Sequence, residues 1–219
     1  MNPDMETVSR PRSRARESYN SLSRWYDLVA GSETPFTILG AHLLDVQPGE
    51  SILEIGCGTG RALTEFANKA KGGMVSAVDI SEKMLTLARG KVPARRVGFC
   101  QADGLFLPCT DEVFDVVFLS FTLELFDTPE IPKVLGECHR VLKPAGRMGI
   151  VSLDKKNTFA VRIYEWFHRR LPVYVDCRPI HLRPFLEEAR FVIQRSMNQR
   201  MWGLPVDIVV ATRTRRTGV

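Results

Sequence analysis

The chain has 219 residues, of which 44% are hydrophobic and 25% charged, and its formal net charge is +5. These totals are ordinary for a globular protein, and the length suits one domain with modest additions. No apolar run approaches the ~20 residues that a membrane span needs, and the polar, basic N-terminus lacks the apolar core of a secretory signal. We therefore expect a cytoplasmic protein.

The cysteines support the same expectation. Their number is odd and none forms a CxxC pair, which argues against both a disulfide framework and a zinc knuckle. We expect a reducing environment and no metal site. The five cysteines are Cys57, Cys100, Cys109, Cys138 and Cys177.

Much of the positive charge lies at the two ends of the chain. The first interpretation is a pair of solvated, mobile tails, at residues 1–13 and 214–219. The alternative is a peripheral contact with an anionic membrane surface or an anionic substrate. Nucleic acid is not expected, because no aromatic and basic interleaving accompanies the charge. The terminal arginines are Arg10, Arg12, Arg14, Arg16, Arg213, Arg215 and Arg216.

The N-terminal part reads as two helices. The first runs from Arg14 to Ala30 and carries Tyr19 and Tyr26 on one face. Gly31-Ser32 is expected to break it, and Glu33 to Leu44 to form a second helix. Two tyrosines on one stripe are either core residues or a cap over a pocket, because a phenol has an apolar ring and a polar tip.

The central feature is the stretch SILEIGCGTG, from Ser51 to Gly60. Its apolar residues predict a buried strand, and Gly56 to Gly60 predicts a turn that leads into a helix. Glycines allow a sharp bend and a close approach of ligand to main chain. The unpaired amides at the start of the helix can bind a ligand. This combination predicts a site for a nucleotide-like cofactor.

Two acidic residues follow the next predicted strands. Asp79 ends the strand Met74 to Asp79, 19 positions after Gly60 (79 − 60), where a βαβ unit presents a carboxylate to ribose hydroxyls. Ser81 is a better cap than Asp79 for the helix Glu82 to Arg89, which would leave Asp79 free. Asp103 follows the third strand, where open α/β sheets also bind ligands.

Strands and helices alternate through the middle of the chain and predict a parallel sheet covered on both faces. After these, two more helices and then an antiparallel hairpin are expected. The further strands are expected at 97–101, 114–120, 147–153, 191–199 and 206–212, and the later helices at 129–142, with Thr128 as its cap, 157–171 and 181–189.

The nicotinamide fingerprint GxGxxG is incomplete, because Arg61 occupies the place of its third glycine. Instead, the chain resembles the class I S-adenosylmethionine-dependent methyltransferases from about Tyr19 to Leu153. The motifs that carry the resemblance are ILEIGCGTG, VDIS, QADGLFLP, FDVVFLSFTLELF and ECHRVLKPAG. Within this class it is most similar to the ubiquinone/menaquinone C-methyltransferase group and the related phospholipid N-methyltransferases.

The resemblance implies an α/β fold: a Rossmann-like seven-stranded, mostly parallel sheet with an antiparallel last strand and helices on both faces. N-terminal helices and a helical insertion after strand five would form a lid, at about 14–45 and 155–190. One domain would cover residues 14–213. Two positions depart from the family's usual glycines, Ala145 and Arg190, and an arginine in a left-handed cap costs on the order of 1 kcal/mol.

The resemblance also implies which residues bind S-adenosylmethionine and its product S-adenosylhomocysteine, without a metal. Asp79 would bind the ribose and Asp103 the adenine amino group. The whole cofactor set is Tyr19, Tyr26, Gly56, Cys57, Gly58, Thr59, Asp79, Ile80, Met84, Ala102, Asp103, Gly104 and Ser120.

The acceptor implied by the resemblance is small and hydrophobic or lipid-like, a quinol-type ring or an amino-phospholipid. A soluble metabolite methylated on nitrogen or oxygen is the alternative, and a nicotinamide-dependent oxidoreductase or a non-catalytic cofactor-binding protein are alternatives of another class. A phenol or ring carbon needs a base, for which the candidates are His168, His181, Tyr26, Tyr164 and Glu124. Of these, His181 and Tyr26 are the predicted catalytic residues. The expected substrate lid is Tyr164, Trp166, Phe167, His168 and His181.

Overall fold

The computed structural model describes residues 23–92, 96–156, 158, 161–164, 166 and 177–214, without the side chains of 23–30. The N-terminal tail and three of the candidate residues, Tyr19, Phe167 and His168, lie outside this description. Among the described residues, no helix combines the length and the hydropathy that a membrane span requires.

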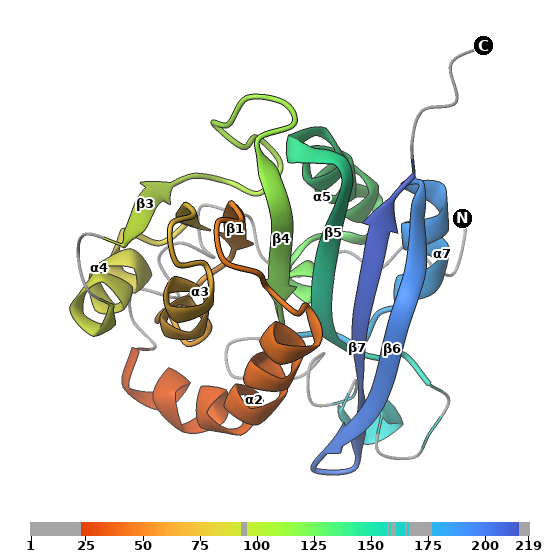
Figure 1. The fold of residues 1–219 in the computed structure, drawn as a ribbon. Coiled ribbons are helices and arrows are strands. Elements are labelled where there is room, and N and C mark those ends of the chain that lie inside the picture. The colour runs from red at the N-terminus through yellow and green to blue at the C-terminus, as the bar shows by residue number, and fades with distance from the viewer. Residues whose placement is uncertain are drawn as a thin grey trace.

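The centre of the fold is a seven-stranded sheet with the order β3-β2-β1-β4-β5-β7-β6 (Figure 1). Strand β7 runs antiparallel to both its neighbours, and the remaining pairs are parallel. The predicted Rossmann-like sheet and its C-terminal hairpin are therefore confirmed. The strands are β1 Ile52–Ile55, β2 Val75–Asp79, β3 Val97–Gln101, β4 Phe114–Ser120, β5 Leu142–Leu153, β6 Phe191–Met201 and β7 Leu204–Arg213.

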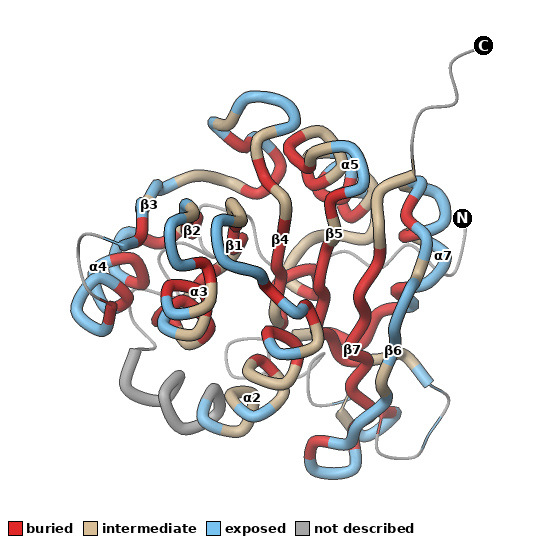
Figure 2. Tube along the Cα trace, in the orientation of Figure 1, coloured by how far each residue is buried: buried red, intermediate tan, exposed pale blue. Residues whose placement is uncertain are grey.

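Each face of the sheet has its own hydrophobic core, because side chains alternate along a strand. Ile52 packs into one core and Leu53 into the other. Helices α2 (Ser23–Leu43), α3 (Leu63–Lys69) and α4 (Glu82–Lys91) contribute to the first core. Helices α5 (Ile131–Val141) and α7 (Leu182–Glu188) cover the opposite face, and the central strands are mostly buried (Figure 2).

Helix α2 corrects the predicted N-terminal organisation. It is one continuous helix that passes through Gly31-Ser32 and contains Pro35, so the expected break does not occur. A glycine in a helix costs only about 1 kcal/mol. The C-terminal part of α2 buries Ala41, and Leu44 directly after it, against the sheet. This tertiary packing outweighs the weak local preference for a break.

The two departures from the family's glycines adopt the backbone that favours glycine. Ala145, at the turn within β5, has a φ of 64°, and Arg190, just after α7, has a φ of 61°. A non-glycine residue in this left-handed region is strained. The predicted left-handed cap at Arg190 is thus confirmed.

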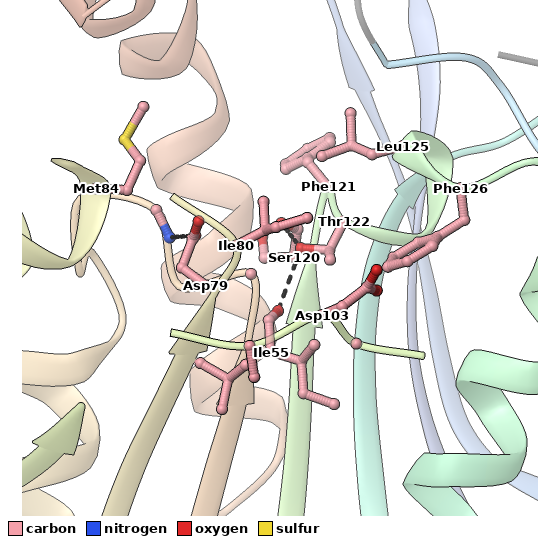
Figure 3. Close-up of a pocket in the computed structure, with 15 residues that line it drawn as sticks. Ile55, Asp79, Ile80, Met84, Asp103, Ser120, Phe121, Thr122, Leu125 and Phe126 are labelled. Carbon is pink, nitrogen blue, oxygen red and sulfur yellow. Dashed lines mark hydrogen bonds between the residues drawn. The ribbon is translucent and has the colours of Figure 1, made fainter. Parts of the chain in front are cut away.

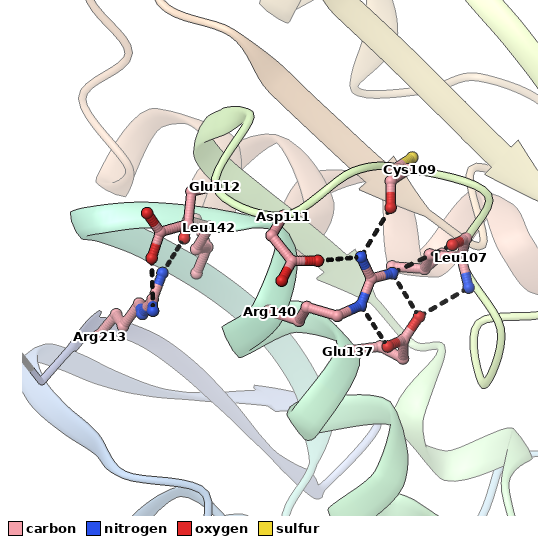
Figure 4. Close-up of polar contacts among 8 residues, drawn as sticks. All are labelled: Leu107, Cys109, Asp111, Glu112, Glu137, Arg140, Leu142 and Arg213. Atoms are coloured by element: carbon pink, nitrogen blue, oxygen red, sulfur yellow. Dashed lines mark hydrogen bonds and ion pairs between the residues drawn. The ribbon is translucent and has the colours of Figure 1, made fainter. Parts of the chain in front are cut away.

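Two arginines, Arg140 and Arg213, hold together the segments around the N-terminal ends of β4 and β5 (Figure 4). Arg140 on α5 pairs with Glu137 at 2.7 Å and Asp111 at 2.8 Å, and donates to the carbonyls of Leu107 and Cys109 at 3.1 and 2.7 Å. It thereby fixes the loop before β4 to α5. Arg213, counted above with the C-terminal positive charge, instead ends β7.

Arg213 is fixed by contacts of its own. Its side chain is 12% exposed, pairs with Glu112 at 2.9 Å and donates to the carbonyl of Leu142. These contacts attach the end of β7 to the start of β5. The charge of Arg213 is therefore part of the fold and does not belong to a solvated tail.

Candidate functional site

A cavity of about 110 Å³ opens where β1, β2, β3 and β4 end (Figure 3). Its wall is mainly apolar, with two carboxylates, and it follows the rule that open α/β sheets bind ligands at the carboxyl ends of their strands. We call it the larger cavity, to distinguish it from a smaller cavity that adjoins it. Nine of the predicted cofactor residues line it: Gly56, Gly58, Asp79, Ile80, Met84, Ala102, Asp103, Gly104 and Ser120.

The glycine loop after β1 approaches the wall of the larger cavity closely. Gly56 has a φ of 68°, and a Cβ atom there would lie 2.5 Å from the side chain of Thr122. Thr122 in turn donates its hydroxyl to the carbonyls of Ser120 and Ile55, at 3.0 and 3.3 Å. A side chain at Gly56 would therefore displace the residues that follow β4.

Asp79 lies at the junction of the glycine loop and α4. Its Oδ2 accepts a hydrogen bond from the amide of Gly58, and its Oδ1 one from the amide of Ser81, both at 2.8 Å. Burial raises the pKa of this carboxyl, while the backbone hydrogen bonds lower it. Ser81 caps α4 as predicted, with Met84 N donating to its Oγ at 3.3 Å. The expectation that Asp79 is free is wrong, although carboxylate oxygens retain further lone pairs for a ligand.

Asp103 and Gly104 form the far side of the larger cavity. The Asp103 carboxylate accepts a hydrogen bond from the amide of Leu105 at 3.0 Å. A Cβ atom on Gly104 would lie 3.2 Å from both Ile55 and the ring of Phe126. Phe126 thus forms an aromatic wall next to Asp103 (Figure 3). A flat apolar group bound here would meet this ring and a carboxylate at its edge.

A second, smaller cavity of about 30 Å³ adjoins the first, and shares Gly56, Gly58, Ser120 and Phe121 with it. Its own wall is polar. Of the four predicted cofactor residues that do not line the larger cavity, Cys57 and Thr59 line this one, while Tyr19 and the side chain of Tyr26 lie outside the described residues. The residues that line only the smaller cavity are Glu33, Thr37, Glu54, Cys57, Thr59 and Arg61.

Two buried polar atoms of the smaller cavity have no hydrogen-bond partner among the described residues. They are Oε2 of Glu54 and Oγ1 of Thr59, on residues that are each 3% exposed. Unsatisfied buried polar atoms are costly and uncommon in folded proteins. A polar ligand group in this cavity would satisfy them.

The smaller cavity is acidic. Burial raises the pKa of Glu33 to about 7, against the opposing charge of Arg61, whose NH1 lies 3.8 Å from Glu33 Oε2. The pKa of Glu54 is raised well above its usual value, first by burial and then by the charge of Asp79. These carboxyl groups favour a cation, which would offset their desolvation.

Helix α2 forms one side of the smaller cavity. The hydroxyls of Thr37 and Ser120 share a hydrogen bond of 2.8 Å, which joins α2 to the end of β4. Glu33 lies one turn before Thr37, and its carbonyl accepts a hydrogen bond from the Thr37 hydroxyl at 3.1 Å. This part of α2 therefore lies against the strand ends, as expected for an N-terminal covering element.

Of the predicted catalytic and lid residues, those whose side chains the structure describes line neither cavity. His181 is exposed at the start of α7 and lines neither cavity. Tyr164 donates its hydroxyl to the carbonyl of Cys177 at 2.8 Å, and Trp166 is 52% exposed. The backbone of Tyr26 belongs to α2, and its side chain lies outside the described residues.

Sequence reasoning missed several residues of the site. Glu54 lies within the predicted strand and has no predicted role, although an acid in the apolar run ILEI is a signal of its own. Glu33 and Arg61 gave no such signal, because only the tertiary fold brings them together. Phe126 gave none either.

Comparisons with known proteins identify the family of this chain. Residues 52–146 match the family model described as a methyltransferase domain. A demethylmenaquinone methyltransferase of Thermus thermophilus is 37% identical over 125 residues, 55% of this chain and 56% of the relative. The ubiquinone/menaquinone biosynthesis C-methyltransferase UbiE of Acidiphilium cryptum is 30% identical over 176 residues, 74% of this chain and 68% of the relative.

The fold is also found among solved structures. The magnesium protoporphyrin IX methyltransferase of Synechocystis PCC 6803, solved with bound S-adenosylhomocysteine, has a TM-score of 0.74 at 21% identity, and the match covers 93% of this chain and all of that one. The match with the Thermus relative spans only slightly more than half of that protein's length. The motifs, the strand order and these relatives together show that the chain belongs to the class I S-adenosylmethionine-dependent methyltransferases.

Proposed function

We propose that this chain transfers the methyl group of S-adenosylmethionine to a small hydrophobic or lipid-like acceptor, a quinol-type ring or an amino-phospholipid. The observation that carries the cofactor part is the pair of joined cavities, one mainly apolar with two carboxylates and one small and acidic. The acceptor part is supported by the relatives, whose names are those of quinone methyltransferases.

The residues present fit this cofactor. In the larger cavity, Asp79 would accept hydrogen bonds from ribose hydroxyls, and Asp103 one from the adenine amino group, with Phe126 against the ring. Carboxylates are suited to both roles because each oxygen accepts more than one hydrogen bond.

The smaller cavity would take the amino-acid end of the cofactor. Glu33 and Glu54 would face the ammonium group, and Arg61 the carboxylate. The orphaned oxygens of Glu54 and Thr59 are the particular atoms that such a group would satisfy.

The bound cofactor supplies a methyl group on a sulfonium, a leaving group that is already activated. The protein then has to align the acceptor with that carbon and exclude water. If a ring carbon or phenol is attacked, a base is needed, and the predicted candidate His181 lines neither cavity.

A single experiment tests the proposal in two stages. Calorimetry should show binding of S-adenosylmethionine and S-adenosylhomocysteine, and much weaker binding of nicotinamide cofactors. A radiolabelled methyl-transfer screen should then yield product with quinol precursors or amino-phospholipids. Absence of cofactor binding would contradict the proposal. Turnover of only small soluble amines or hydroxyl compounds would replace the acceptor by the alternative class, and tight nicotinamide binding would indicate an oxidoreductase.

A further inference from the structure

A short segment between the insertion and α7 passes along the ends of β4 and β5. The amide of Ile180 donates to the carbonyl of Leu153 at 3.0 Å, and the amide of Lys155 donates to the carbonyl of Ile180 at 3.1 Å. Asp154 and Ile180 form a parallel bridge. We call residues Cys177 to Ile180 the return segment.

Arg178 of the return segment is buried although it is a cation. It is 5% exposed, and its NH2 donates to the carbonyl of Phe126 at 2.7 Å. Phe126 is the aromatic wall of the larger cavity, and its ring lies beside Gly104. Arg178 itself does not line that cavity. Its hydrogen bond therefore acts on the cavity through the backbone of Phe126.

Glu124 completes a closed set of contacts. It is fully buried in the short 3-10 helix Leu123–Leu125, and its Oε1 accepts a hydrogen bond from the amide of Leu153 at 2.8 Å. The positive charge of Arg178 opposes the effect of burial on the Glu124 carboxyl. These contacts form a closed loop. Arg178 binds the backbone of Phe126, and Glu124 lies two residues before Phe126 in the chain. Glu124 accepts a hydrogen bond from Leu153, and Leu153 accepts one from Ile180 in the return segment.

We propose that Arg178 is a positioning residue that fixes the aromatic wall of the cofactor cavity and couples it to the return segment. The coupling follows from geometry, because the wall, the end of β5 and the return segment cannot shift independently while these contacts hold. Ligand in the larger cavity then stabilises the return segment without touching it. This inference rests on the proposed function, since it takes S-adenosylhomocysteine as the ligand.

Hydrogen exchange of the full chain, with and without saturating S-adenosylhomocysteine, tests the coupling. In the wild type, ligand should slow amide exchange in the glycine loop Gly56–Gly60, and at least threefold in the return segment. Arg178→Met, which keeps the volume and removes the charge, should lose the effect in the return segment and retain it in the glycine loop. Arg178→Lys should restore part of it. Arg183→Ala is the matched control, because Arg183 on α7 pairs, among the described residues, with Ser196 at 3.2 Å and Asp207 at 3.9 Å and not with Phe126.

The outcomes separate this inference from the proposed function. Failure of S-adenosylhomocysteine to bind the wild type would overturn the proposed function and, with it, this inference. Binding without slower exchange in the return segment, or undiminished coupling in Arg178→Met, would overturn the positioning role alone. Should Arg178→Met not fold, Arg178→Lys decides: it keeps the positive charge but replaces the guanidinium that donates to the carbonyl of Phe126, and undiminished coupling there would equally overturn the role.

Discussion

Asp79 and Gly58 are joined by a hydrogen bond of 2.8 Å that ties the end of β2 to the glycine loop. Asp79→Ala removes this acceptor and leaves the amides of Gly58 and Ser81 without it. We expect affinity for S-adenosylhomocysteine to fall at least about tenfold, about 1.4 kcal/mol. Calorimetry measures this. Glu82→Ala, which removes only an exposed ion pair with Arg89, is the control. Equal affinity in Asp79→Ala and the control would refute the assignment of Asp79.

Gly56→Ala should destabilise the protein more than Gly72→Ala. Both glycines have a positive φ, of 68° and 85°, so both substitutions incur the left-handed penalty of about 1 kcal/mol. Only at Gly56 would the new Cβ collide with a side chain, that of Thr122 at 2.5 Å, whereas Gly72 has open space around it. Urea unfolding should show an additional loss of about 1–3 kcal/mol for Gly56→Ala, in the range of overpacked cores. Similar losses would mean that the glycine loop is not closely packed.

Ala145→Gly and Arg190→Gly should each stabilise the fold. Relief of the left-handed strain stabilises the folded state by about 1 kcal/mol. The extra conformational freedom of glycine stabilises the unfolded chain by about 0.5 kcal/mol. The expected gain is about 0.5 kcal/mol for each. Ala189→Gly is the control, because Ala189 has a φ of −78° and can only lose stability. A gain at Ala189 as well would show that φ is not the cause.

Ligand discrimination should depend on pH through Glu33. Its pKa of about 7 means that the carboxyl becomes charged as the pH rises from 6 to 8. Negative charge in the smaller cavity favours the cationic S-adenosylmethionine over its uncharged thioether product. The ratio of the two dissociation constants should therefore shift severalfold towards S-adenosylmethionine over this range. Glu33→Gln should flatten the profile; a wild-type ratio that does not change with pH would exclude this role.

Stability should also depend on pH through Glu124. Burial raises its pKa from 4.5 to about 8 in the folded protein, so the native state holds a proton that the unfolded chain has lost. Its contribution to stability is present below about pH 4.5 and disappears as the pH rises through 8. Glu124→Gln cannot titrate, so its stability relative to the wild type should increase by at least about 1 kcal/mol between pH 5 and 8.5. Urea unfolding at the two pH values measures this difference, and a constant difference would contradict it.

The sheet could be predicted from the sequence because its signals are local. Apolar runs, the glycine turn and the cap at Ser81 each depend on neighbouring residues, and the C-terminal hairpin follows from short spacing. The break expected at Gly31 failed for the opposite reason. Packing of distant residues against Ala41 decided the course of α2, and no local pattern contains that information.

The larger cavity could be predicted for a similar reason, and the smaller one could not. Asp79 and Asp103 end parallel strands, which places them at one edge of the sheet by topology alone. Glu33 and Arg61 meet only because α2 lies across the strand ends, through the contact of Thr37 with Ser120. The position of a helix on a sheet is a property of the whole core.

Because α2 is one continuous helix, a rotation at one of its ends displaces the other end. Its 21 residues span about 31 Å at 1.5 Å per residue. One end is held in the core near Leu44, and Glu33 lies about midway along it. A rotation of about 5° at the held end displaces the other end by about 3 Å on that length. Substitutions in the core near Leu44 should therefore alter the access to the acidic cavity, at a distance from it and without changing any residue in its wall.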